Sequence, residues 1–152
     1  MNKPRPEHSP MAQFPVADDC LQIGGIPLTR LAQQIGRTPF YAYDRRLIAH
    51  KVELLRRHLP TDIHLHYAMK ANPMPAVVQH LVTQVDGLDV ASAGEMQVAL
   101  DTGMSPEKIS IAGPGKTPAE LSMALAAGIV INMESENEME TIARLAHQLG
   151  VR

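Results

Sequence analysis

The chain has 152 residues, 45% of them hydrophobic and 20% charged, so it is long enough for a globular domain with its own core. Its 14 Lys and Arg and 16 Asp and Glu residues are interspersed, which excludes the clustered basic surface of a nucleic-acid-binding protein. A single cysteine excludes an internal disulfide framework, and the apolar stretches are far shorter than the ~20 residues of a membrane helix, so a cytoplasmic location without membrane contact is expected.

The sequence pattern divides the chain into three parts. Residues 1–19 begin with several prolines and charged residues, which predict a disordered lead-in. Residues 20–45 predict a short segment of strand and helix. Residues 46–152 show a regular alternation of short apolar strands and helices, which predicts a larger repeating unit.

Within the second part, residues at turn and cap positions suggest where the elements begin and end. Gly24 and Gly25 predict a tight turn after a short strand. A helix should follow, capped by Thr29 and ended by Gly36. The sequence FYAYD at residues 40–44 alternates aromatic and other residues and predicts another strand.

The third part repeats about every 20 residues, each repeat being an apolar strand followed by a helix of about three turns. Strands are expected at 63–69, 87–92, 108–112 and 128–133, and helices at 46–59, 75–85, 93–103, 117–127 and 136–150. This order predicts an α/β fold with a parallel sheet. A Rossmann-like sheet and a (β/α)8 barrel both fit, but the absence of GxGxxG after the first strand disfavours the dinucleotide-binding form.

Four strand–helix units correspond to the N-terminal half of a (β/α)8 barrel. A half barrel would leave both edge strands unpaired and one side of its core open to water. We therefore expect the chain to be truncated.

Lys70 is the strongest candidate for chemistry, because it follows the strand at 63–69 directly. The carboxyl ends of parallel strands form the functional face of such folds. Flanking Met69 and Ala71 predict a partly desolvated amine with a lowered pKa, which could form an imine with an aldehyde. A lysine that merely ends a strand is the alternative.

Other polar residues near the strand ends have plainer interpretations. His64 and His66 are expected to be packed and hydrogen-bonded, and no metal site is predicted. The Gly-rich GPGK at 113–116 could suggest a phosphate loop, but a tight turn that lines the pocket is favoured. Ser92 and Glu95 fit a helix N-cap with its partner three residues on.

Four stretches, in this order, resemble fold-type III pyridoxal-phosphate-dependent decarboxylases of the diaminopimelate, ornithine and arginine type. They are TPFYAYD at 38–44, HYAMKANPMPAVVQHL at 66–81, GLDVASAGEMQVAL at 87–100 and KISIAGPGKTPAEL at 108–121. The resemblance covers about residues 20–152. A narrower likeness is to the decarboxylases associated with exosortase loci.

The resemblance implies a (β/α)8 barrel of the alanine-racemase-like type, a β-rich second domain, pyridoxal 5′-phosphate as cofactor and a homodimer. It implies that Lys70 forms the aldimine with the cofactor, and that the Asp89 carboxylate lies close by as a second catalytic residue. Further residues that it places near the cofactor are Ala68, Tyr67, Asn72 and Glu95.

The implied function is decarboxylation of an amino acid similar to diaminopimelate or ornithine. Three alternatives remain open: an amino-acid racemase of the same fold type, a non-catalytic homologue that binds partner proteins, and an inactive fragment. The phosphate-binding and second-subunit residues are expected outside the sequence, so the 152-residue chain alone is expected to be inactive.

Overall fold

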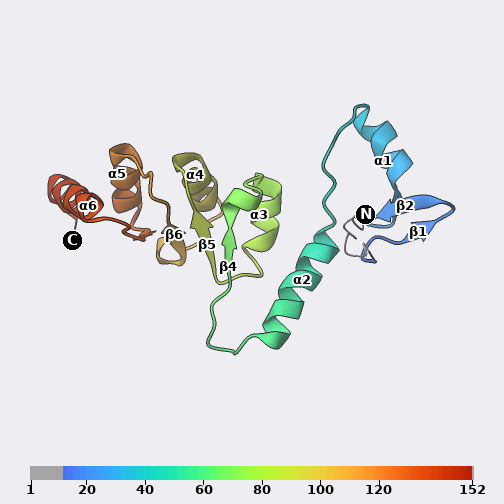
Figure 1. Ribbon diagram of the computed structural model, residues 1–152, viewed down its shortest axis with the longest axis horizontal. Coiled ribbons are helices and arrows are strands. Elements are labelled where there is room, and N and C mark those ends of the chain that lie inside the picture. Colours follow the sequence, from blue (N-terminus) through green and yellow to red (C-terminus); the bar gives the residue numbers. More distant parts are fainter. Residues whose placement is uncertain (1–11, 152) are drawn as a thin grey trace, which may run out of the picture. The chain divides into compact units, whose positions relative to one another are not determined.

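A computed structural model describes residues 12–151 of the chain (Figure 1). The chain divides into two compact units, residues 1–51 and 52–152, and each is described by itself. Most of the expected disordered lead-in, residues 1–11, lies outside the described residues. Within residues 12–151, no helix combines the length and the apolar character needed to cross a bilayer.

The first unit contains a three-stranded antiparallel sheet. Its strands are β1 (Val16–Ala17), β2 (Cys20–Ile23) and β3 (Ile26–Pro27), in that order. Gly24 and Gly25 form the predicted turn, both with positive φ, as a two-residue hairpin with the twist of its strands requires. Because β1 pairs with β2, the predicted lead-in is wrong for residues 16–19.

Helix α1 (Leu28–Ile35) follows the sheet; the sequence predicted its last residue correctly but not its N-cap. Gly36 ends it in the left-handed conformation, as expected. The predicted cap by Thr29 is wrong, because Pro27 occupies the N-cap and Thr29 lies inside the helix. The Thr29 hydroxyl lies 3.7 Å from the sulfur of Cys20 instead.

The predicted strand at residues 40–44 is also wrong. This segment is irregular and leads directly into helix α2 (Arg45–His58). The Tyr41 side chain is 91% exposed. A strand needs a neighbouring strand to pair its backbone groups, and within residues 12–151 no strand pairs with this segment. The alternating side chains of residues 40–44 were therefore not sufficient to predict a strand.

The second unit is the predicted series of strand–helix units (Figure 1). Its elements are β4 (His66–Ala68), the one-turn helix η1 (Met69–Ala71), α3 (Pro75–Leu81), β5 (Gly87–Val90), α4 (Ala93–Asp101), η2 (Pro106–Lys108), β6 (Ile109–Ile111), α5 (Pro118–Ala127), β7 (Val130–Ile131) and α6 (Glu136–Leu149). The strands are parallel and ordered β4-β5-β6-β7, which confirms the predicted α/β fold class. Each strand is shorter than predicted, because pairing with its neighbours is confined to two to four residues.

The two faces of this sheet differ in character. Alternate residues of β5 and β6 are buried on the face that the helices cover. The core on that face consists of Met69, Val78, Leu88, Val90, Met96, Ala99, Ile109, Ile111, Ala124 and Ile129. On the opposite face, strand register places Ala68, Asp89 and Ser110 side by side. The half-buried polar residues therefore share one face of the sheet.

Helices α4, α5 and α6 begin with the same device, a Ser or Thr followed three residues later by Glu. The pairs are Ser92 and Glu95, Thr117 and Glu120, and Ser135 and Glu138. In each pair the hydroxyl accepts the backbone N–H of the glutamate, at 3.1–3.3 Å. Each glutamate in turn accepts a backbone N–H at or just before the cap, so two N–H groups are satisfied per helix.

An ion pair at the amino end of β5 gives a pH-dependent contribution to stability. Asp86 accepts from Arg56 at 2.6 Å and from the backbone N–H of Leu65 at 2.6 Å. The Arg56 guanidinium, with that N–H, lowers the pKa of Asp86 to about 2. A carboxyl with a lowered folded-state pKa stabilises the fold above its usual pKa, and this stabilisation is lost as the pH falls toward 2.

We therefore expect Asp86→Asn to lower the free energy of unfolding by about 1 kcal/mol at pH 7, because the pair is about one-third exposed and solvent weakens it. The difference from the unchanged protein should shrink as the pH falls toward 2. Urea unfolding at several pH values measures this. Glu53→Gln is the control, since the Glu53–Arg57 pair is more than 60% exposed; an equal loss in that variant would contradict the prediction.

Candidate functional site

Lys70 lies in the one-turn helix η1, at the carboxyl end of β4. Its neighbour Met69 is fully buried in the core and anchors this turn. Lys70 itself is exposed, so the predicted partial desolvation is wrong for the described residues. Within residues 12–151, the Lys70 amine makes no hydrogen bond or ion pair, so it is available to a ligand.

Two of the predicted cofactor-proximal residues hold the turn that carries Lys70. The Tyr67 hydroxyl donates to the backbone carbonyl of Asn72 at 3.0 Å. The Asn72 side-chain oxygen accepts the backbone N–H of Met74 at 3.0 Å, which is an Asx turn leading into α3. Tyr67 also packs against the core on the helix-covered face. Contact of either residue with a cofactor stays a prediction.

Asp89 lies one strand away from the lysine-bearing segment, on the polar face of the sheet. The register pairs Ala68 with Asp89 and Asp89 with Ser110. Paired residues of neighbouring strands are about 5 Å apart, and Lys70 follows Ala68 by two residues. The structure thus brings the two predicted catalytic residues to the same edge of the sheet, next to the small side chain of Ala68.

Glu95 acts at the start of α4, as one of the two sequence interpretations expected. Its backbone N–H donates to the Ser92 hydroxyl at 3.3 Å. Its carboxylate accepts the N–H of Ala91 at 2.8 Å rather than that of the cap residue itself. Glu95 therefore fixes the loop that follows Asp89, and direct contact with a cofactor stays a prediction.

The sequence did not reveal the contacts of Lys116, a lysine in the loop after β6. Its side chain is only 1% exposed, and its amine lies 3.0 Å from a carboxylate oxygen of Glu138. The amine also donates to the backbone carbonyls of Gly113, at 2.7 Å, and Asn132, at 2.9 Å. Lys116 therefore ties the loop after β6 to the loop after β7.

These contacts leave the GPGK loop poorly suited to bind a phosphate. The N–H of Gly113 donates to a carboxylate oxygen of Glu134 at 2.6 Å, and the amine of Lys116 is taken. Burial would raise the pKa of Glu138, but the N–H of Glu134 and the Lys116 amine together lower it. The loop is a turn, as the sequence favoured, and two of its donors, the Gly113 N–H and the Lys116 amine, already have anionic partners.

The sequence predicted that His64, just before β4, and His66, in β4, are packed, and this prediction is wrong. His64 and His66 are both exposed rather than packed. Strand alternation places His66 on the sheet face opposite the helices. Its ring closely approaches Gly87 on β5, where a Cβ atom would have no room. Within residues 12–151, His, Cys, Asp and Glu form no group of three or more that could hold a metal.

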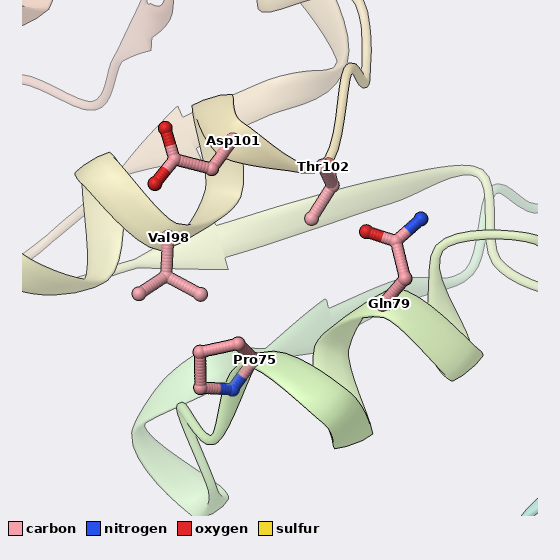
Figure 2. A pocket seen from close by; sticks show the side chains of 5 residues that line it. All are labelled: Pro75, Gln79, Val98, Asp101 and Thr102. Atoms are coloured by element: carbon pink, nitrogen blue, oxygen red, sulfur yellow. The ribbon is translucent and has the colours of Figure 1, made fainter.

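A small pocket lies elsewhere, between α3 and α4 (Figure 2). It has a volume of about 100 Å³ and is lined by Pro75, Gln79, Val98, Asp101 and Thr102. Neither Lys70 nor Asp89 lines it. A cavity of this size can hold a few water molecules but not a drug-sized ligand. The candidate site is therefore the polar edge that carries Lys70 and Asp89, not this pocket.

Comparison with known protein families identifies the family to which the chain with this site belongs. Residues 45–152 match the model of the pyridoxal-dependent decarboxylase family, specifically its pyridoxal binding domain. The chain belongs to this family. The matched region contains every strand and helix of the second unit, together with Lys70 and Asp89. This decarboxylase family membership confirms the resemblance noted in the sequence and indicates pyridoxal phosphate as the cofactor.

Individual relatives are consistent with this membership. The chain is 37% identical over 145 residues to a diaminopimelate decarboxylase of Aquifex aeolicus, covering 95% of this chain and 34% of that protein. It spans about a third of the length of the relatives it matches. A crystal structure of an Aquifex aeolicus protein is 38% identical, with a TM-score of 0.83, over 90% of this chain and 34% of that one.

A second solved structure is the diaminopimelate decarboxylase of Helicobacter pylori in complex with L-lysine. It is 33% identical, with a TM-score of 0.71, over 82% of this chain and 32% of that one. The fold of the second unit is therefore part of a (β/α)8 barrel of the decarboxylase type, as predicted. The four strand–helix units account for about half of such a barrel.

The residues of this family member fit one end of pyridoxal phosphate. An amine without internal partners at a strand end suits an aldehyde, and the neighbouring carboxylate of Asp89 suits the cationic nitrogen that results. The Gly113 N–H and the Lys116 amine of the loop at 113–116 are engaged, so the described residues fit the aldehyde end of the cofactor better than its phosphate.

Proposed function

We propose that this chain supplies the lysine and the first carboxylate of the active site of a pyridoxal-phosphate-dependent decarboxylase that acts on diaminopimelate or a similar diamino acid. The observation that carries the proposal is the difference between the two lysines at the carboxyl ends of the strands. The amine of Lys116 has three partners within 3.0 Å, whereas that of Lys70 has none within residues 12–151.

The roles of the residues follow from their positions. Lys70 would hold pyridoxal phosphate at its aldehyde end through the side-chain amine. When bound, pyridoxal phosphate draws electrons from the substrate Cα, which allows the carboxylate to leave as CO2. The Asp89 carboxylate favours the protonated form of the nitrogen through which the cofactor is held. Ala68 keeps the space between them open.

The substrate class is part of the proposal. Relatives named diaminopimelate decarboxylase support it, among them proteins of Aquifex aeolicus and Zymomonas mobilis that are 37% and 34% identical. The proposal also includes a homodimer and a cytoplasmic location, for which the resemblance and the composition are the support. It further includes residues 46–152 as the cofactor-binding part and residues 20–45 as the segment that precedes it.

The test uses the natural protein that contains this chain, with pyridoxal phosphate added. We expect the unchanged protein to show the visible absorption band of lysine-bound cofactor, and Lys70→Ala to lose it. Within residues 12–151 the other lysine at this edge is Lys116, whose amine is engaged. Borohydride reduction followed by peptide mass spectrometry should place the cofactor on Lys70. CO2 release from diaminopimelate, ornithine and arginine then identifies the substrate.

The control is Lys108→Ala, since Lys108 is exposed in η2 at the amino end of β6, away from the proposed site. This variant should keep the band and the activity. A band that persists in Lys70→Ala would contradict the role of Lys70. Racemisation of the substrates without CO2 release would contradict decarboxylation while leaving the cofactor lysine in place.

A further inference from the structure

Among residues 12–151, Ser110 is the side chain that hydrogen-bonds to the Asp89 carboxylate. It lies on β6, paired in register with Asp89 on β5, and both residues are half-buried on the polar face of the sheet. The Ser110 hydroxyl donates to the Oδ1 atom of Asp89 at 2.9 Å. The two residues are 21 positions apart in sequence, so the contact exists only because the parallel register aligns them.

This contact leaves the second oxygen of Asp89 available. Within residues 12–151, Oδ1 accepts from Ser110, and no hydrogen bond of ordinary geometry occupies Oδ2. Ser110 approaches from the β6 side, whereas Ala68 and Lys70 lie on the β4 side. A carboxylate held by one oxygen from one side presents its other oxygen to the opposite side, where the Lys70 turn lies.

We propose that Ser110 is a positioning residue of the decarboxylase site, which holds the Asp89 carboxylate toward the nitrogen that joins Lys70 to the cofactor. This inference rests on the proposed function. A free Asp side chain rotates about two bonds, and the hydrogen bond from Ser110 restricts that rotation. Holding the carboxylate before the cofactor binds means that no reorganisation is needed afterwards.

The other charged groups around Asp89 do not duplicate this role. Lys70 in η1 is the proposed partner itself, and His66 lies on the same face of β4 but two residues earlier in the strand. Glu95 of α4 is engaged with the N–H of Ala91. Strand β6 has no titratable side chain and contributes only the hydroxyl of Ser110 to this face.

The test compares Ser110→Ala with Ser110→Thr in the natural protein loaded with pyridoxal phosphate. Ser110→Ala should keep the cofactor on Lys70 but bind it about threefold to tenfold more weakly, as the loss of one hydrogen bond predicts. Its visible spectrum should shift toward the unprotonated form at fixed pH. Ser110→Thr keeps a hydroxyl at the same place and suits a strand, so it should restore both properties.

Asp89→Asn provides the second half of the test. If Ser110 acts through Asp89, adding Ser110→Ala to Asp89→Asn should change neither affinity nor spectrum further. An unchanged Ser110→Ala variant, a Ser110→Thr variant that behaves like Ser110→Ala, or additive effects in the double variant would each overturn the proposal. If Ser110→Ala does not fold, Ser110→Cys, a weaker donor of similar size, replaces it with the same criteria.

These outcomes are separate from the test of the proposed function. Loss of the visible band in Lys70→Ala depends on the lysine alone. A protein in which Lys70→Ala loses the band while Ser110→Ala matches the unchanged protein would retain the decarboxylase proposal and reject the positioning role.

Discussion

Replacing Gly87 with alanine is expected to destabilise the second unit by about 2 kcal/mol or more, because β5 has no room for a methyl group there. A Cβ atom at this position would lie 2.5 Å from a ring carbon of His66 and 2.5 Å from the backbone carbonyl oxygen of Lys108. The histidine ring can rotate away, but the carbonyl belongs to the segment that enters β6. Urea unfolding followed by circular dichroism measures the loss.

Two further variants make this prediction specific. Gly94→Ala places a methyl group in α4 where nothing lies within 4 Å, so the higher helix propensity of alanine should raise stability by about 0.5 kcal/mol. Adding His66→Ala to Gly87→Ala should recover only part of the loss, because the contact with the Lys108 carbonyl remains. Gly87→Ala with unchanged stability, or full recovery in the double variant, would contradict the backbone argument.

Lys116→Met is expected to cost about 3 kcal/mol of unfolding free energy, because it removes one partner of a nearly buried ion pair and leaves the other. The Glu138 side chain is only 10% exposed and would lose the amine that lies 3.0 Å away. The carbonyls of Gly113 and Asn132 would lose the same donor. Lys108→Met, at an exposed lysine, is the control and should change stability by less than about 0.5 kcal/mol.

The pH dependence of the Lys116→Met variant tests its cause. In the unchanged protein, burial acts to raise the pKa of Glu138, while the Glu134 N–H and Lys116 hold it below its usual value. Without the Lys116 amine, the effect of burial is opposed less strongly, and the pKa of Glu138 should rise. Glu138 then becomes neutral at a higher pH, so the loss of stability should diminish as the pH falls. A loss that is the same at pH 4 and pH 7 would contradict this explanation.

Glu138→Gln offers a second check on the pair. Combined with Lys116→Met, it removes both charges, and the double variant should be more stable than the sum of the single losses predicts. If the losses of stability in the two single variants simply add, the Lys116 amine and the Glu138 carboxylate do not interact favourably.

The sequence was sufficient for features that depend on local pattern. Alternation of apolar strands and helices predicted the second unit, and Ser135 and Gly36 were correct as helix boundaries. These signals work because a cap or a turn is decided by a few adjacent residues. The strand predicted at 40–44 failed for the opposite reason, since pairing with a distant segment decides whether an alternating stretch becomes a strand.

The candidate site shows the same division. Lys70 and Asp89 could be placed at strand ends from their own neighbours in the sequence. The roles of Ser110 and Lys116 could not, because each depends on a partner at least 16 residues away that the strand order brings close. A Gly-rich loop with a lysine has the same composition whether the lysine meets a phosphate or a glutamate. The loop after β7 and the first turn of α6 decide between them, through Asn132 and Glu138.

The repeated Ser/Thr–Glu starts of α4, α5 and α6 also affect how this edge treats anions. A helix start ordinarily carries a partial positive charge from its unpaired N–H groups. Here Glu95, Glu120 and Glu138 place a full negative charge against three such starts in succession, and backbone N–H groups hold the pKa of Glu120 below its usual range. The Glu138 carboxylate is also paired with the Lys116 amine. An incoming dianion would therefore meet repulsion chiefly at the starts of α4 and α5.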